Sequence, residues 1–243
     1  MISKVIFKKI TFCNINSNKF RKYILKSGLF VFPAGPALAN IENSKIYYNS
    51  LQKADFVFFD SGFFVLLLRI FKNINVLKFS GYKFLRLFFE YLKENNKKSI
   101  FLVNPNANFS RSNKLYLKNL GIKKINSYLA PKYNTKNIAD KKLLKLIKKI
   151  KPNFILINIG GGVQEVLGLY LRKKLKLRIP IICTGAAISF FTGDQAPINN
   201  FVDKYYLGWL LRIFFNPLIF FKRYIIGLKL IPMVILNKIK VIY

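Results

Sequence analysis

Short apolar segments that alternate with helical patterns constrain the fold of this 243-residue chain most strongly. Six segments, each ending at a turn of small or polar residues, are predicted strands: residues 29–32, 54–59, 99–103, 125–129, 153–159 and 180–183. Amphipathic helices are predicted at residues 81–94, 111–120, 140–150 and 163–177. Strands that are apolar on both faces and alternate with helices form parallel sheets covered on both sides. The sequence therefore predicts an α/β fold with a Rossmann-like, largely parallel sheet and helices on both faces.

The net charge, the absence of histidine and the two cysteines limit the ligands and the catalytic groups that we expect in this chain. The chain has 42 Lys and Arg against 9 Asp and Glu, a formal net charge of +33, which favours an anionic partner such as phosphate groups, nucleic acid or an acidic membrane leaflet. The absence of histidine excludes Ser-His-Asp and Cys-His catalysis and histidine-liganded metals. Cys13 and Cys183 show no Cys-x-x-Cys spacing, so we expect two buried thiols in a reducing compartment, and no metal site.

The N-terminus, the longest apolar stretches and the C-terminal segment indicate where in the cell the chain is expected to act. The N-terminus alternates lysine with apolar residues and lacks the continuous apolar core of a signal peptide. The longest apolar stretches, 56–71 and 207–221, each contain an arginine and fall short of the roughly 20 residues of a spanning helix, so we predict no transmembrane helix and a cytoplasmic location. From residue 204 to residue 243 there is no acidic residue, and aromatic side chains mingle with Lys and Arg. We expect a sheet domain over residues 1–203 and a basic, aromatic helical appendage over residues 204–243, suited either to an anionic membrane surface or to ordinary packing on the domain.

Candidate functional residues follow the predicted strands, because ligands of open parallel sheets bind beyond the carboxyl ends of the strands. Asp60 comes directly after one strand and is either a general base or the N-cap of the next helix. Three glycines at residues 160–162 open another helix, where backbone N–H groups either face a diphosphate or serve only a tight turn. Gly185, in a third turn, allows either close approach of a ligand or tight packing. Position alone leaves these alternatives open.

Taken in order, several motifs resemble those of the WecG/TagA/CpsF family of bacterial glycosyltransferases. Residues 54–62 are similar to the family's Ala-Asp…Asp-Gly segment, and residues 160–165 are similar to Gly-x-Pro-Lys-Gln-Glu. Further matches in the C-terminal third are residues 185–190, 193–197, 207–212, 216–217 and 223–224. The resemblance covers roughly residues 32–225.

The resemblance implies a fold of the glycosyltransferase E type and an inverting, metal-independent transfer with no cofactor. The sugar, of N-acetylmannosamine or glucose type, would move from a UDP donor to a polyprenyl-diphosphate-linked saccharide in cell-surface polysaccharide synthesis, on the inner face of the cell membrane. Carried over residue by residue, Asp60 would be the base, Gln164 would line the sugar-nucleotide pocket with the turns at Gly160 and Gly185, and Arg212 and Arg223 would neutralise the diphosphate. Family members self-associate, so a homo-oligomer is also implied.

The sequence departs from the family pattern at several polar positions. Ser189, Gly208 and Asn216 replace acidic residues, Gln195 and Val163 replace basic ones, and Gly35 replaces an asparagine of an early loop. Two alternatives therefore stand beside the active transferase. An inactive, membrane-associated homologue would bind UDP or a partner without turnover, and a basic nucleic-acid-binding protein would show steeply salt-dependent binding, although no nucleic-acid motif is found and no nucleic acid is expected.

Overall fold

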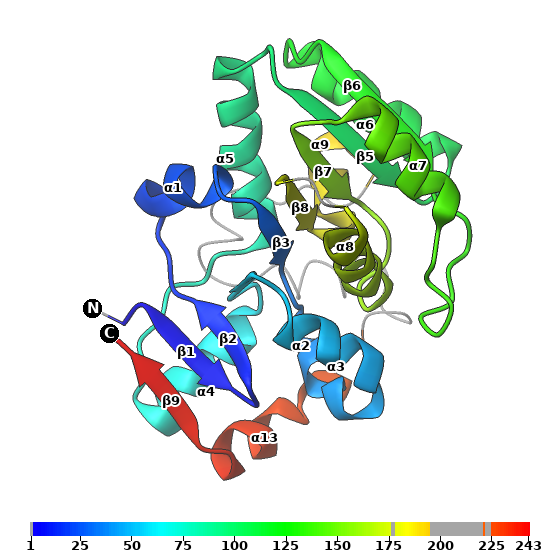
Figure 1. The fold of residues 1–243 in the computed structure, drawn as a ribbon. Coiled ribbons are helices and arrows are strands. Elements are labelled where there is room, and N and C mark those ends of the chain that lie inside the picture. The colour runs from blue at the N-terminus through cyan, green and yellow to red at the C-terminus, as the bar shows by residue number, and fades with distance from the viewer. Residues whose placement is uncertain (1, 176–177, 195–220, 222–224) are drawn as a thin grey trace.

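The computed structural model describes residues 2–175, 178–194, 221 and 225–243. Its sheet contains the strands β1 (Lys4–Phe7), β2 (Ile10–Cys13), β3 (Gly28–Val31), β4 (Phe56–Phe58), β5 (Ser99–Asn104), β6 (Lys124–Leu129), β7 (Phe154–Ile157), β8 (Pro180–Cys183) and β9 (Ile239–Ile242), in the spatial order β6-β5-β7-β8-β3-β4-β2-β1-β9. The strands from β6 to β2 in this order run parallel, and β1 and β9 add two antiparallel pairings at one edge (Figure 1). The predicted α/β, largely parallel sheet is confirmed.

The helices cover both faces of this sheet (Figure 1). One face carries α2 (Gly35–Ala39), α3 (Lys45–Gln52), α4 (Gly62–Lys72), α7 (Lys141–Ile150), α8 (Val163–Lys174) and α13 (Leu230–Leu236). The other carries α1 (Phe20–Ile24), α5 (Gly81–Glu94), α6 (Ala107–Asn119) and α9 (Ser189–Thr192). Three short 3-10 helices, η1 (Ser17–Lys19), η2 (Ile41–Asn43) and η3 (Gly185–Ile188), complete the connections. None of the helices in the described part of the chain is long and apolar enough to cross a membrane.

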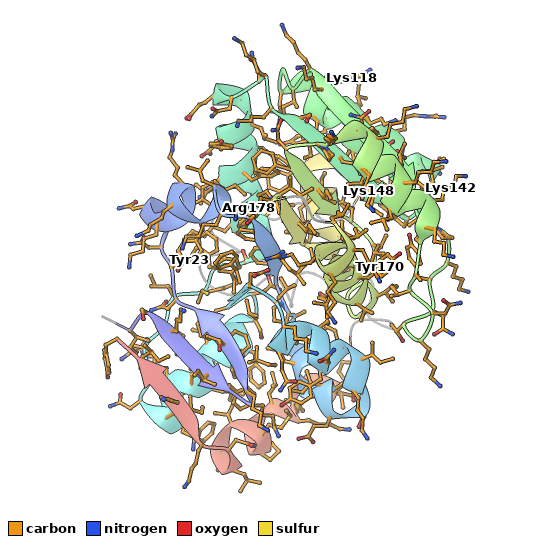
Figure 2. All side chains as sticks on the ribbon, in the orientation of Figure 1. Tyr23, Lys118, Lys142, Lys148, Tyr170 and Arg178 are labelled. Atoms are coloured by element: carbon orange, nitrogen blue, oxygen red, sulfur yellow. The ribbon has the colours of Figure 1, made fainter. Side chains whose placement is uncertain are left out.

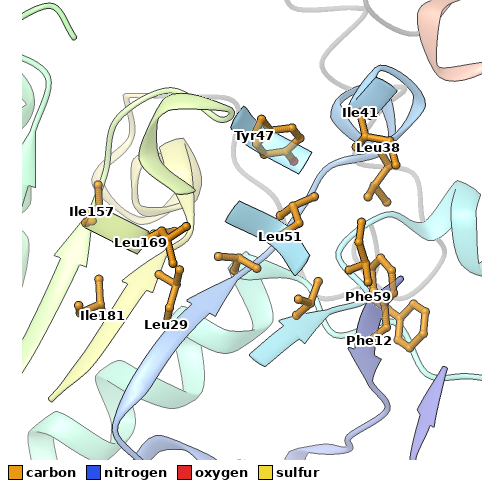
Figure 3. Close-up of a cluster of buried hydrophobic side chains, with 14 of the residues drawn as sticks. Phe12, Leu29, Leu38, Ile41, Tyr47, Leu51, Phe59, Ile157, Leu169 and Ile181 are labelled. Atoms are coloured by element: carbon orange, nitrogen blue, oxygen red, sulfur yellow. The ribbon is translucent and has the colours of Figure 1, made fainter. Parts of the chain in front are cut away.

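Two hydrophobic cores result from the period-two alternation of the buried strands. In β3, Leu29 and Val31 point to one core while Phe30 points to the other. Figure 3 shows the first core, where Leu29 and Ile181 of the sheet meet Leu51 of α3 and Leu169 of α8. Burial on both sides explains why these strands are apolar throughout.

The element boundaries agree with the predicted ranges to within a few residues, except at the start of α6. This helix begins at Ala107, four residues before the predicted start, because the Asn106 side chain accepts a hydrogen bond from the N–H of Phe109 and caps it. The N-terminal hairpin β1–β2 was not predicted. Its two-residue turn is made by Lys8 and Lys9, both with positive φ, and lacks the Asn-Gly signal of such turns.

The end of the chain returns to the sheet. Leu230 and Val234 of α13 are fully buried in the first core, and β9 pairs with β1 along its whole length. Residues 230–242 of the predicted C-terminal appendage thus contribute a helix and an edge strand to the sheet domain. Most of the preceding residues, from 204 to 224, lie outside the described residues, and the membrane-associating role of the appendage stays a prediction.

Candidate active site

The candidate site lies at the edge of the sheet where the parallel strands end. Strands β5 and β7 are neighbours in the sheet, but the chain continues from β5 to β6 on one side and from β7 to β8 on the other. Open α/β sheets bind ligands beside such a change in the direction of strand order. Asp60 follows β4, the glycine turn of residues 160–162 follows β7, and Gly185 follows β8. The fold therefore brings three of the predicted site positions to one edge.

Asp60 is held by the start of a neighbouring helix. Ser61, not Asp60, caps α4, because the Ser61 hydroxyl accepts a hydrogen bond of 3.2 Å from the N–H of Phe64. Asp60 Oδ1 instead accepts a 2.8 Å hydrogen bond from the N–H of Gly81, the first residue of α5. The N-terminus of a helix attracts negative charge, so this contact orients the carboxylate toward the start of α5.

Two glycines allow the close packing around Asp60. A β-carbon on Gly81 would lie 3.4 Å from that of Thr184, so the start of α5 rests against the turn after β8. A β-carbon on Gly35 would lie only 2.7 Å from the hydroxyl oxygen of Ser61. At the start of α2, a side chain at position 35 would therefore displace the Ser61 hydroxyl that caps α4, which favours glycine where the family resemblance implies asparagine.

Gln164 joins the two glycine turns. Its side chain is buried, and its Oε1 accepts a 2.7 Å hydrogen bond from the N–H of Gly185. Its Nε2 donates to Glu165 Oε1 at 3.0 Å and to the carbonyl oxygen of Cys183 at 3.3 Å. These bonds place the Gln164 amide inside the protein, between the turns, so its contact with a sugar nucleotide stays a proposal.

Glu165 is a site residue to which the sequence reasoning gave no role. Its carboxylate is buried beneath the glycine turn and accepts a 2.7 Å hydrogen bond from the N–H of Gly162. Burial raises the pKa of Glu165 to about 7, and the nearby charge of Asp60 adds to this effect. The available signal was its place in the first turn of a helix, three residues after the last glycine, where a glutamate caps the preceding backbone N–H.

The glycine turn itself is open. Gly160 and Gly161 are exposed, and β-carbons on residues 160–162 would meet no atom within 4 Å. Gly162 (φ +89°) and Gly185 (φ +62°) adopt left-handed backbone conformations that favour glycine. Backbone N–H groups at the start of the 12-residue helix α8 can therefore be approached closely by an anionic group.

Buried polar atoms without partners gather at the same edge. Asn104 at the end of β5 accepts hydrogen bonds of 2.9 Å from Asn113 and from Asn158, which follows β7. Within the described residues, the amide nitrogen of Asn104, the amide oxygens of Asn113 and Asn158 and the hydroxyl of Thr184 have no hydrogen-bond partner. Such atoms are costly in a protein interior, and their concentration beside the strand ends marks this edge as chemically distinct.

The other aspartate of the segment 54–62 lies elsewhere, and two predicted site residues lie outside the described residues. Asp55 precedes β4, at the opposite edge, where it accepts a hydrogen bond from the N–H of Leu29 and pairs with Arg172 at 3.0 Å. Arg212 and Arg223 lie outside the described residues. In the described part of the chain, no group of three or more His, Cys, Asp and Glu side chains is placed to hold a metal ion.

Comparison with known proteins identifies the family. No curated protein matches the chain closely enough to indicate a relative. The model of the glycosyl transferase WecG/TagA/CpsF family, however, matches residues 5–241, nearly the whole chain including β1 and β9. The expected family is thereby confirmed, and with it the general activity of a glycosyltransferase in cell-surface polysaccharide synthesis. The chain belongs to the WecG/TagA/CpsF family of glycosyltransferases.

Proposed function

We propose that this glycosyltransferase moves an N-acetylmannosamine-type or glucose-type sugar from a UDP donor to a polyprenyl-diphosphate-linked saccharide, with inversion and without a metal ion. The observation that supports this most is Asp60, a carboxylate fixed by Gly81 at the strand edge that also carries the glycine turn. A fixed carboxylate beside an anion-accepting turn is what a direct displacement on a nucleotide sugar requires.

In the proposed reaction, Asp60 removes the proton from the attacking hydroxyl of the acceptor. The hydroxyl oxygen forms a bond to the anomeric carbon while the bond from that carbon to the β-phosphate oxygen breaks, and its electron pair leaves with UDP. Attack from the face opposite the leaving group inverts the anomeric configuration. The hydrogen bond from Gly81 holds the carboxylate in place, which lowers the entropic cost of aligning base and acceptor.

The departing UDP develops negative charge that has to be stabilised. The N–H groups of Gly162 and Gly185 already donate to Glu165 and Gln164, so the exposed backbone at Gly160 and Gly161 and the positive end of α8 are proposed to face this charge. Arg212 and Arg223 are proposed to supply fixed positive charge. Gln164 is proposed to line the sugar-nucleotide pocket between the two turns, and Glu165 would act indirectly, since its carboxylate holds the turn at Gly162. In the proposed mechanism these protein groups stabilise the leaving UDP, so no metal ion is needed for that step.

The proposed acceptor carries an isoprenoid chain, so the reaction is placed at the inner face of the cell membrane. The basic, aromatic composition of residues 204–243 supports an anionic membrane surface as a partner. A homo-oligomer, which the family resemblance implies, is also part of the proposal.

A thermal-shift titration with UDP, UDP-N-acetylmannosamine, UDP-N-acetylglucosamine and UDP-glucose, in EDTA, tests the donor. We expect one UDP-sugar to raise the melting temperature more than the others, and transfer assays with that donor to show turnover. Binding without sugar transfer or donor hydrolysis would favour the inactive homologue. No shift with any nucleotide, together with a large salt-sensitive shift on single-stranded RNA, would favour a nucleic-acid-binding protein.

A further inference from the structure

Helix α4 exposes apolar side chains where a surface helix normally carries polar ones. Its inner side is buried through Phe64 and Leu68, which are fully inaccessible to solvent. On its outer side Leu66, Ile70 and Phe71 remain 43%, 62% and 45% exposed. Much of the apolar surface of these three side chains therefore stays in contact with water and is available for burial against a partner.

Helix α13 extends this apolar surface. It packs against α4, and the Lys72 ammonium group donates a 2.9 Å hydrogen bond to the carbonyl oxygen of Ile235 across the junction. Ile235 and Leu236, at the end of α13, are 44% and 80% exposed. We call the exposed side chains of Leu66, Ile70, Phe71, Ile235 and Leu236 the α4–α13 face.

Positive charge surrounds the α4–α13 face. Arg69 and Lys72 lie on α4, and the chain has no acidic residue from 61 to 89 or from 204 to 243. Directly after Leu236, Lys238 and Lys240 line a hollow of about 560 Å³ together with Lys9 and with Lys8, whose ammonium group pairs with Glu42. An apolar surface with a cationic border is complementary to the boundary between acyl chains and anionic headgroups.

The positive charge also bears on which partner can cover this face, an anionic surface or a second copy of the chain. A second copy of the chain would bring together two molecules of net charge +33, which disfavours self-association through a basic surface. Basic side chains such as Lys118, Lys142 and Lys148 project from α6 and α7 at the far end of the molecule as well (Figure 2). Charge alone therefore does not select the α4–α13 face, whereas its apolar side chains do.

We propose that the α4–α13 face docks on an anionic lipid bilayer, with its apolar side chains in the headgroup boundary and the surrounding cations on lipid phosphates. The predicted membrane-associating appendage, residues 204–243, contains Ile235 and Leu236, whereas Leu66, Ile70 and Phe71 of α4 lie outside it and are new to the docking surface. The proposal deepens the proposed function and rests on it for the lipid-linked acceptor. Leu66 and Ile70 follow Asp60 by six and ten residues, so at roughly 1.5 Å per helical residue the base stays within about 15 Å of the docked part of α4.

Site-specific fluorescent labelling tests the docking directly. Both native cysteines are buried, so a cysteine introduced on the surface can be labelled selectively with an environment-sensitive dye. Ile70→Cys and Leu236→Cys probe the α4–α13 face, and Leu115→Cys is the matched control, because Leu115 is 58% exposed on the lysine-rich helix α6. Each labelled full-length protein is mixed with vesicles of phosphatidylcholine alone or with added phosphatidylglycerol.

We expect a blue shift of the dye at positions 70 and 236 with anionic vesicles only, and none at position 115. Binding of the protein to vesicles with all three labels still in water would overturn the proposal. A blue shift at positions 70 and 236 without vesicles, accompanied by dimers in sedimentation, would overturn it in favour of a second copy.

Vesicle affinity provides an independent measurement. The double variant Ile70→Ser/Leu236→Ser should bind anionic vesicles roughly tenfold to a hundredfold more weakly than the native protein, whereas Leu115→Ser should bind within about twofold of it. Equal losses in both variants would contradict a specific face. Because no sugar nucleotide is needed, failure of this proposal is distinguishable from failure of the proposed transferase activity, which the donor titration measures.

Discussion

Replacing Glu165 with glutamine should change how the stability of the protein depends on pH. The folded protein raises the pKa of Glu165 from 4.5 to about 7, mainly through burial. A group with a raised folded-state pKa contributes stability that is fully present below the unfolded pKa and lost as the pH rises through the folded pKa. The native protein therefore loses this contribution between about pH 4.5 and pH 7 and somewhat above.

The magnitude follows from the difference between the two pKa values. Each pKa unit corresponds to about 1.4 kcal/mol, so ionising Glu165 in the fold costs about 3 kcal/mol more than in the unfolded chain. Between pH 5 and pH 8 this amounts to about 2.5 kcal/mol. Glutamine does not ionise, but it offers one acceptor oxygen where Glu165 accepts from both Gly162 and Gln164. The lost hydrogen bond should destabilise the variant by about 1–3 kcal/mol, a contribution that does not change with pH and adds to the pH-dependent difference.

The assay is urea unfolding of the native protein and Glu165→Gln at pH 5 and pH 8. The difference in unfolding free energy should move by about 2.5 kcal/mol in favour of the variant as the pH rises. Glu94→Gln is the control, because Glu94 is an exposed carboxylate paired with Arg21, and its difference should stay nearly constant. If the difference in unfolding free energy between Glu165→Gln and the native protein does not change with pH, the claim that burial raises the pKa of Glu165 is refuted.

Three further predictions test the packing that positions the site. Gly168→Ala would bring a β-carbon to 2.6 Å from a leucine side chain of β3, so urea unfolding should show a loss of about 1–3 kcal/mol, and unchanged stability would contradict this close approach. Leu230→Ala should lower the unfolding free energy by about 2–5 kcal/mol, whereas Leu236→Ala should change it by no more than about 0.5 kcal/mol. The reason is that Leu230 is buried and Leu236 is exposed, and equal losses would contradict the placement of α13 in the core. Gly185→Ala, at φ +62° and 3.4 Å from the Gln164 amide, should lose about 1–2 kcal/mol and weaken UDP-sugar binding in a thermal-shift assay, and full binding would remove this turn from the donor site.

The central part of the fold was predictable because its signals are local. Strands such as β7 and β8 are buried on both faces and therefore read as uninterrupted apolar segments. The edge strand β9 and its neighbour β1 each contain an exposed lysine and did not stand out. Their pairing joins residues more than 230 positions apart, and no local pattern specifies such a partner.

The site was predictable in position and less so in its contacts. Asp60 could be placed because the carboxyl ends of parallel strands share an edge. Its hydrogen bond to Gly81 depends on how α5 packs against the turn at Thr184, a tertiary contact absent from the pattern. The inward orientation of Gln164 likewise depends on Gly185, which lies 21 residues away in the sequence.

The most direct test of the proposed mechanism is the turnover of Asp60→Asn. Asparagine retains an acceptor oxygen for the Gly81 N–H, so the fold and the UDP site should be preserved while the base is lost. We predict that kcat falls by about 10²–10⁴-fold while the dissociation constant for UDP changes by less than about twofold. Asp55→Asn, the same change at the opposite sheet edge, is the control and should leave kcat nearly unchanged. An undiminished kcat in Asp60→Asn would contradict the assignment of Asp60 as the catalytic base.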